Sequence, residues 1–276
     1  MPALASVLAA IDEWPVSTAA AAVVDATGVR AAHGPVDEAL PLASVTKPLA
    51  VLAMLVAIEE GALDFDDAAD ESLLPGATFR HLLAHASGIA PERPLRSFAP
   101  GVRRVYSNVG IELAGTLVSL AVEMPFTDYF TQALVEPLGL HATALEGSPA
   151  RDGVSSVADL ARVLHEVMAP SGLLDSSTLT DATSVQYPGL RGVLPGFGSQ
   201  DPNDWGLGFE IRGTKDPHWT GATNSPQTFG HFGQSGTMCW IDPVAEVGLV
   251  ALTDRAFGPW AADAWPRLSD AVLATA

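Results

Sequence analysis

A serine and a lysine stand three residues apart at the start of an apolar segment, in Ser44-Val45-Thr46-Lys47. Residues at this spacing share one face of a helix, so the serine hydroxyl would lie beside the lysine amine. A serine is a weak nucleophile until a base takes its proton, and a desolvated lysine near the positive end of a helix favours its neutral form. The spacing predicts Ser44 as a nucleophile and Lys47 as its base, although a serine before a helix is more often only a cap.

Lysine is rare in this chain, which has 14 basic residues but lysine only at Lys47 and Lys215. A buried lysine can lose its proton, whereas arginine effectively cannot. A lysine kept at position 47 in an arginine-rich sequence therefore favours a need for an amine there, with chance as the alternative.

A second polar pair lies in Tyr106-Ser107-Asn108, shortly after the turn Pro100-Gly101. Residues two apart in an extended loop point the same way, so Tyr106 would be able to relay a proton while Asn108 holds a substrate amide or carbonyl. The simpler interpretation is a helix start, with Ser107 or Asn108 as the cap and Tyr106 in the core. Both interpretations stay open at this point.

The third segment is the glycine-rich run His231-Phe232-Gly233-Gln234-Ser235-Gly236, on a predicted strand. Gly233 would let a substrate lie close to the backbone. The backbone N–H groups of Gln234 and Ser44 would together form an oxyanion hole. The alternative is a glycine-rich hairpin in which His231 is incidental.

These segments fall in different elements of the predicted fold. Periodicity and turn residues predict helices at 2–13, 45–60, 110–122, 158–168 and 260–276, and strands at 18–25, 29–33, 206–212, 227–232, 237–241 and 247–253. We therefore predict an α+β fold, in which both chain ends form one antiparallel sheet flanked by the N- and C-terminal helices. Residues 1–62 and 195–276 form the sheet domain, residues 63–194 a mainly helical insert, and the active site lies at their junction.

Taken together and in this order, the three segments resemble the serine β-lactamase and penicillin-binding-protein superfamily. The tyrosine and the histidine make the chain similar to the class C branch, which includes esterases and D-amino-acid peptidases. The resemblance runs from about Leu40 to Val250. Further segments that resemble that branch are His81-Leu82-Leu83-Ala84-His85-Ala86-Ser87-Gly88, Pro137-Leu138-Gly139-Leu140 and Trp205-Gly206-Leu207-Gly208-Phe209.

The resemblance implies a β-lactamase/transpeptidase-like fold and a role for each matching residue. Ser44 would be acylated, Lys47 would deprotonate it, and Tyr106 would share in proton transfer before water releases the acyl group. The substrate-binding residues would be Asn108, His231, Gly233 and Gln234, with the Gln234 amide completing the oxyanion hole.

Two departures from the branch bear on the substrate. His231 stands where true class C β-lactamases have lysine, and Phe232 stands where threonine or serine is usual, which would make the rim more apolar. We therefore expect a serine hydrolase of the carboxylesterase type, acting on short-chain or aryl esters. The alternatives are a β-lactamase or D-amino-acid peptidase using the same machinery, and an inert relative that only binds a small molecule.

The net charge of −18 argues against nucleic acid or an anionic membrane as a partner, because phosphate contacts need basic patches. The lone cysteine, Cys239, has the setting of a buried strand and is expected to be a core thiol. The apolar stretch Pro2–Ile11 follows no lysine or arginine and precedes Asp12 and Glu13, unlike a signal peptide. We therefore expect a cytoplasmic protein.

Two histidines four residues apart, His81 and His85, have the spacing of metal ligands on a helix. No glutamate follows His81, so the sequence is not His-Glu-x-x-His. The Ser87-Gly88 turn after His85 argues further against a helix there. We expect no metal and no cofactor.

Overall fold

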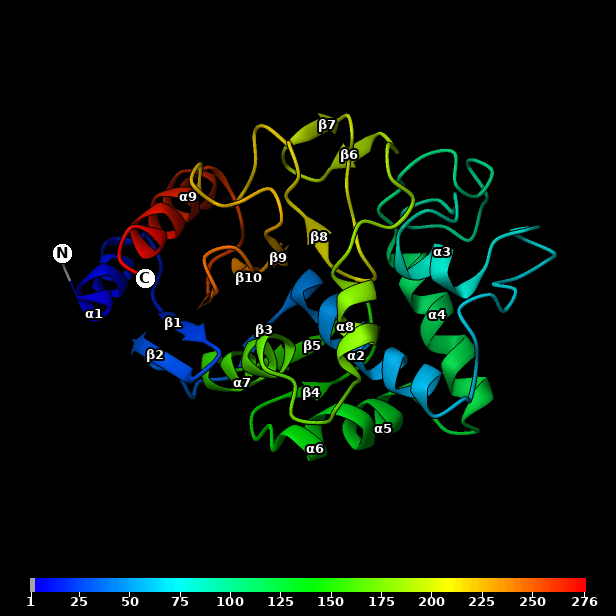
Figure 1. Cartoon of the computed structure of the whole chain (residues 1–276), viewed down its shortest axis with the longest axis horizontal. Helices are drawn as coiled ribbons and strands as arrows, with labels where there is room; N and C mark the ends of the chain where they lie inside the picture. Colours follow the sequence, from blue (N-terminus) through cyan, green and yellow to red (C-terminus); the bar gives the residue numbers. More distant parts are fainter. Residues whose placement is uncertain (1–2) are drawn as a thin grey trace.

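The computed structural model describes residues 3–276 and is built around one antiparallel sheet (Figure 1). Its six strands run in the order β2-β1-β11-β10-β9-β8, so strands from the two ends of the chain pair directly, with Ala19 opposite Thr253. The strands are β1 (Ala19–Asp25), β2 (Gly28–His33), β8 (Glu210–Ile211), β9 (Phe229–Gly233), β10 (Thr237–Asp242) and β11 (Val247–Thr253).

The terminal helices cover one face of the sheet. Helix α1 (Leu4–Leu8), its 3-10 continuation (Ala9–Glu13) and helix α9 (Pro259–Leu273) lie side by side at one end of the molecule (Figure 1). Their apolar side chains pack on the alternate residues of β1, β10 and β11 that face them, with Trp240 and Trp265 fully buried in this layer.

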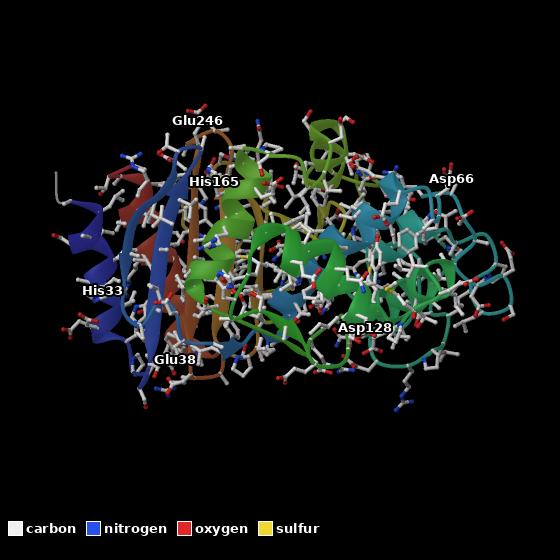
Figure 2. All side chains as sticks on the ribbon, turned by 90° about the horizontal axis from the view of Figure 1, so that it is seen from below. His33, Glu38, Asp66, Asp128, His165 and Glu246 are labelled. Carbon is white, nitrogen blue, oxygen red and sulfur yellow. The ribbon has the colours of Figure 1, made fainter. Side chains whose placement is uncertain are left out.

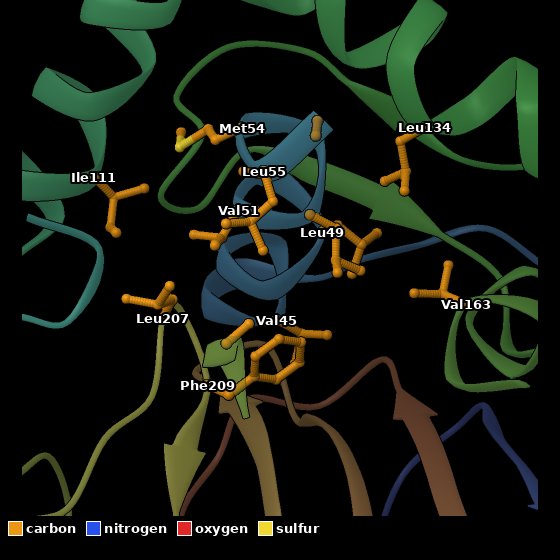
Figure 3. Packing of buried hydrophobic residues seen from close by; sticks show 14 of the residues in the cluster. Val45, Leu49, Val51, Met54, Leu55, Ile111, Leu134, Val163, Leu207 and Phe209 are labelled. Atoms are coloured by element: carbon orange, nitrogen blue, oxygen red, sulfur yellow. The ribbon is translucent and has the colours of Figure 1, made fainter. Parts of the chain in front are cut away.

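Helix α2 (Thr46–Glu59) forms the centre of the layer on the other face and is buried on nearly every side. Figure 3 shows Val45, Val51 and Leu55 of this region among side chains such as Ile111 and Leu207 that come from separate segments. Such burial of an apolar helix fixes its first turn, and therefore Ser44 and Lys47, relative to the sheet.

Short helices and small strands complete this second layer. They are α3 (Phe79–Leu83), α4 (Asn108–Ala121), α5 (Phe126–Phe130), α6 (Glu136–Leu138), α7 (Val157–Met168), α8 (Ser176–Ala182), β3 (Leu40–Pro41), β4 (Ala144–Leu145), β5 (Gly153–Ser155), β6 (Gly192–Leu194) and β7 (Gly198–Gln200). A π-helical segment, Thr131–Val135, joins α5 to α6. Helix α7 packs against β1 and β11 although it lies within the predicted helical insert, so the insert and the sheet share a core.

The α+β fold, with its antiparallel sheet from both chain ends and its flanking terminal helices, is confirmed. The strand predicted at 206–212 is wrong for its first half, and only Glu210–Ile211 is strand. Gly208 has a φ of +74°, and the Gly206 N–H donates to the Phe209 carbonyl, so the chain turns there before it enters the sheet. Of the predicted helix at 2–13, Pro2 lies outside the described residues.

The acidic residues are spread over the surface. Figure 2 shows Glu38, Asp66, Asp128 and Glu246 at separate places around the molecule, and all four are exposed. Within residues 3–276 no single helix is long and apolar enough to cross a membrane, and the one helix pair that passes together is bent by 86°.

Candidate active site

Ser44 lies in a 3-10 turn, Ala43–Val45, that directly precedes α2. Ala43 has a φ of +47°, in the left-handed region that is unfavourable for alanine and costs about 1–3 kcal/mol. Neighbouring strands hold this turn in place, because the Leu42 N–H donates to the Gly153 carbonyl and the Leu42 carbonyl accepts from Thr237 Oγ1 at 2.8 Å. The turn presents the Ser44 side chain at the end of the central helix.

Lys47 is fully buried, and its Nζ has three oxygen neighbours. They are Ser44 Oγ at 3.1 Å, Asn108 Oδ1 at 2.7 Å and the Ala150 carbonyl at 2.8 Å. Burial, together with the positive charge of Arg151, lowers the pKa of Lys47 to about 7. A neutral amine has two N–H bonds for the amide and carbonyl oxygens and one lone pair for the Ser44 hydroxyl proton. The three contacts therefore suit a base for Ser44.

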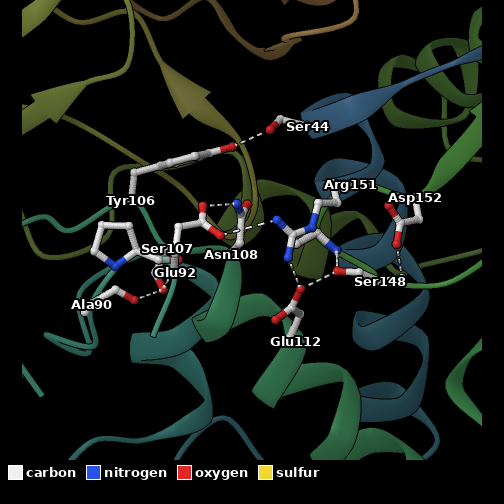
Figure 4. Close-up of polar contacts among 12 residues, drawn as sticks. Ser44, Ala90, Glu92, Tyr106, Ser107, Asn108, Glu112, Ser148, Arg151 and Asp152 are labelled. Carbon is white, nitrogen blue, oxygen red and sulfur yellow. Dashed lines mark hydrogen bonds and ion pairs between the residues drawn. The ribbon is translucent and has the colours of Figure 1, made fainter. Parts of the chain in front are cut away.

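Tyr106 approaches Ser44 from the loop before α4. Its hydroxyl donates to Ser44 Oγ at 2.7 Å (Figure 4). Lys47 Nζ lies 4.6 Å from the centre of its ring. Desolvation raises the pKa of Tyr106 above its usual value, so the phenol stays protonated at neutral pH. Tyr106 is therefore placed as a proton donor next to the Ser44 oxygen.

A charged cluster surrounds Asn108 at the mouth of the site, and the sequence did not predict it. The Asn108 amide nitrogen donates to Glu92, and the Arg151 guanidinium bridges Glu92 at 3.3 Å and Glu112 at 2.9 Å (Figure 4). The charge of Arg151 lowers the pKa of Lys47, while those of Glu92 and Glu112 raise it. Burial is the main cause of the lowered pKa of Lys47, and the charges of this cluster adjust it.

His231 lies in β9 and is buried, with its Nδ1 at 2.7 Å from the Phe232 carbonyl. Burial, and then the nearby charge of Lys47, lower the pKa of His231 to about 3. Phe232 is only 5% exposed, packs among aromatic residues under α9 and lines the small cavity at Ser44 instead of an open rim.

A packing constraint explains the glycine at position 233. A Cβ there would lie 2.2 Å from the Leu42 carbonyl oxygen and 2.4 Å from Thr237 Oγ1. The glycine lets β9 pack against the turn that carries Ser44; its expected role in admitting a substrate close to the backbone stays a prediction. Gln234 follows directly, and within residues 3–276 the hydrogen bonds outside regular helices and strands include none donated by the backbone N–H groups of Gln234 and Ser44. Both remain available for an oxyanion.

Two hollows meet at Ser44 and Tyr106. One is an open cleft of about 640 Å³ whose walls include Pro91, Phe98 and Val193. The other is a cavity of about 50 Å³ behind Ser44, lined by Leu194, Pro195, Trp205, Glu210, His231, Phe232 and Gln234 in addition. The two hollows share Ser44, Tyr106, Pro195 and Gln234, so a substrate carbonyl at Ser44 would have both a large and a small space next to it.

His81 and His85 contact different partners. His81 Nδ1 lies 2.9 Å from Thr78 Oγ1 in the capping box of α3. His85 Nδ1 accepts from the Ser107 N–H at 3.3 Å, and its ring packs on Tyr106 with centroids 4.8 Å apart. His85 therefore supports the loop that carries Tyr106 and Asn108, a contact that its sequence spacing did not predict.

Comparison with known proteins agrees with this geometry. The family model described as Beta-lactamase matches residues 5–274. A solved structure described as a beta-lactamase from Mycobacterium bovis is 50% identical, covers 97% of this chain and 98% of its own, and superposes with a TM-score of 0.94.

More distant relatives have other described activities. A hydrolase with promiscuous acyltransferase activity is 19% identical, with 98% and 97% of the two chains covered and a TM-score of 0.80, which shows the fold alone. A putative D-alanyl-D-alanine carboxypeptidase from Salmonella schwarzengrund is 28% identical over 59% of this chain and 48% of its own length. The chain thus spans about half the length of the curated relatives it matches. By its sequence and its fold, this chain belongs to the beta-lactamase family of serine hydrolases.

Proposed function

We propose that this protein is a carboxylesterase that cleaves short-chain or aryl esters through an acyl-enzyme on Ser44. The observation that carries the proposal is the position of Ser44 Oγ between Lys47 Nζ at 3.1 Å and the Tyr106 hydroxyl at 2.7 Å. The nucleophilic hydroxyl needs a base to accept its proton, and the alcohol that leaves the ester needs an acid to supply one. Lys47 and Tyr106 together supply this base and this acid.

The reaction follows from these positions. Neutral Lys47 takes the Ser44 proton as Oγ attacks the ester carbonyl carbon, and the N–H groups of Ser44 and Gln234 stabilise the oxyanion. The carbon–oxygen bond to the alcohol then breaks, and the alcohol leaves with a proton delivered from Lys47 through Tyr106. Water, deprotonated by the same residues, then attacks the acyl carbon; the bond from that carbon to Ser44 Oγ breaks, Oγ takes back the proton, and the acid is released.

The apolar part of the open cleft, whose walls also include Glu92, Arg103 and Arg104, supports an uncharged ester. Pro91, Phe98 and Val193 are apolar, and Phe98 and Val193 are 38% and 49% exposed, so a bound acyl or aryl group would remove apolar surface from water. The similarity in fold to a hydrolase with acyltransferase activity is compatible with ester chemistry.

Amide hydrolysis is the second candidate. The M. bovis structure, 50% identical, is described as a beta-lactamase, and the Salmonella relative as a putative D-alanyl-D-alanine carboxypeptidase. A chain that only binds a small molecule is the third, but it would have no need for Ser44, Lys47 and Tyr106 in hydrogen-bonding contact.

The test is hydrolysis of p-nitrophenyl butyrate and of a chromogenic cephalosporin by the wild type and by Ser44→Ala. We expect the wild type to cleave the ester but not the cephalosporin, and Ser44→Ala to cleave neither. Cleavage of the cephalosporin alone would favour the amide hydrolase. Equal background rates for both proteins on both substrates would reject the esterase and favour the binding protein.

A further inference from the structure

The 50 Å³ cavity behind Ser44 has an unusual polar lining for its size. Among the described residues, no lysine or arginine lines it. Its polar groups besides Ser44 and Tyr106 come from Glu210, His231 and Gln234, and the rest of its wall is apolar. The volume suffices for roughly a few non-hydrogen atoms, since about 10–15 Å³ measured in this way holds one water.

The ring of His231 has a defined hydrogen pattern. Its Nδ1 lies 2.7 Å from the Phe232 carbonyl, which can only accept, so Nδ1 carries the hydrogen. Burial lowers the pKa of His231 to about 3, so the ring is neutral and Nε2 is an acceptor. His231 is 3% exposed, and Nε2 has no partner among residues 3–276. A buried acceptor without a partner is costly, and His231 lines the cavity, so a donor group bound there would relieve that cost.

A negatively charged substrate group is disfavoured in this cavity, because Glu210 is a buried carboxylate. Lys215 Nζ lies 2.8 Å and His218 Nε2 2.9 Å from Glu210 Oε1, and Trp219 donates to Oε2. Burial opposes ionisation of Glu210, but His218 and Lys215 outweigh it and lower its pKa, so the carboxylate stays charged.

The N–H groups of the Lys215 ammonium are all used in hydrogen bonds within the protein, so none is left for a ligand in the cavity. Besides Glu210, the ammonium donates to the carbonyls of Asp204 and Ile211. Because Lys215 is committed to Glu210, a substrate carboxylate in the cavity would meet an acceptor nitrogen and no cation free to pair with it.

We propose that this cavity selects the substrate: it takes a short, uncharged group that ends in a hydrogen-bond donor, such as a hydroxyl, which donates to His231 Nε2, and it rejects a carboxylate. The proposal rests on acylation of Ser44, because it concerns the part of the ester next to the attacked carbonyl. The favoured substrates are hydroxyalkyl esters.

Three butyrate esters of similar size test this directly: 2-hydroxyethyl, propyl and carboxymethyl butyrate. We expect kcat/KM of the wild type to be about five- to tenfold higher for the hydroxyethyl than for the propyl ester, the gain of one hydrogen bond. The carboxymethyl ester should be slower than the propyl ester by about tenfold or more.

Two variants assign the effect to His231. His231→Leu should remove the preference for hydroxyethyl over propyl, and His231→Lys should raise the carboxymethyl-to-propyl ratio. The ratios within one protein cancel any general loss of activity, and labelling of Ser44 by a fluorophosphonate shows that each variant is folded.

The outcomes separate this inference from the proposed function. Equal rates of the wild type on all three esters, or a hydroxyl preference that persists in His231→Leu, would overturn the inference alone. If the wild type cleaves none of the esters and the fluorophosphonate does not react, the esterase assignment fails and the inference with it. Should a variant not fold, the wild-type ratios alone decide.

Discussion

The amine of Lys47 lies 3.1 Å from the hydroxyl of Ser44, although the two residues belong to different helical turns. Ser44 is in the 3-10 turn and Lys47 in the first turn of α2, and a spacing of three keeps both on one side of the chain. Because Lys47 is buried without a carboxylate in direct contact, its proton is weakly held, and its relation to Ser44 is that of a base.

The pH dependence of the ester reaction should report Lys47. Its pKa is lowered to about 7, so below that pH it is an ammonium ion that cannot accept the Ser44 proton. We expect kcat/KM for an uncharged ester to rise with pH through a midpoint of about 7 and then to level off. A steady-state pH profile checks this, and a rate that is flat through neutral pH would contradict it.

Replacing Lys47 by methionine removes the base with little change in volume. We expect kcat/KM to fall by about 10²–10⁴-fold, the usual contribution of a general base. Thermal unfolding of Lys47→Met should show that the protein is still folded. A variant that keeps its activity within about tenfold would show that another group accepts the proton.

Arg151 should tune the base without touching the reacting atoms. Its charge lowers the pKa of Lys47, and it pairs with Glu92 and Glu112, whose charges act in the opposite direction. We expect the pH profile of Arg151→Ala to move to higher pH, and that of Arg151→Lys to stay close to the wild type. Identical profiles for all three proteins would mean that Arg151 has no electrostatic role.

Tyr106→Phe removes one hydroxyl and keeps the ring that packs on His85 and Trp205. We expect kcat/KM to fall by about 10²–10⁴-fold, because the Ser44 oxygen and the leaving alcohol lose their proton donor. Thermal unfolding should change little. A variant as active as the wild type would exclude Tyr106 from proton transfer.

Gly233→Ala tests the packing of β9 against the turn of Ser44. A Cβ 2.2 Å from the Leu42 carbonyl forces the backbone apart, at a cost of about 1–3 kcal/mol in the free energy of unfolding. The control is Gly258→Ala, where the nearest atom would lie 3.8 Å away. Chemical denaturation should show the larger loss for Gly233→Ala, and equal losses would contradict this explanation of the glycine.

The relation of Ser44 to Lys47 was predictable because it is local, and that of Tyr106 to Asn108 for the same reason. The structure contains both features that were considered for Tyr106-Ser107-Asn108, the helix cap and the polar pair that faces the site. Ser107 caps α4 by accepting from the Gly110 N–H at 3.0 Å, while its neighbours reach Ser44 and Lys47. A cap in the middle of the segment is what directs the flanking side chains to the site.

The remaining partners come from loops without a regular pattern. Arg151, Glu92 and the Ala150 carbonyl are far from Lys47 in the sequence, and nothing in their spacing indicates that the fold brings them together. Burial of Lys215 against Glu210 could not be predicted either, since it depends on how 204–219 folds over the end of the sheet. The scarcity of lysine drew attention to Lys47 alone, although Lys47 and Lys215 are both buried, at 0% and 2% exposed.

The most direct test of the account is the site and the pH dependence of covalent labelling by a small fluorophosphonate, mapped by mass spectrometry of peptides. We predict one adduct, on Ser44, whose rate of formation increases with pH around the Lys47 pKa of about 7 and which is lost in Ser44→Ala. An adduct on another residue, or no adduct under conditions in which the protein is folded, would contradict the assignment of Ser44 as the nucleophile.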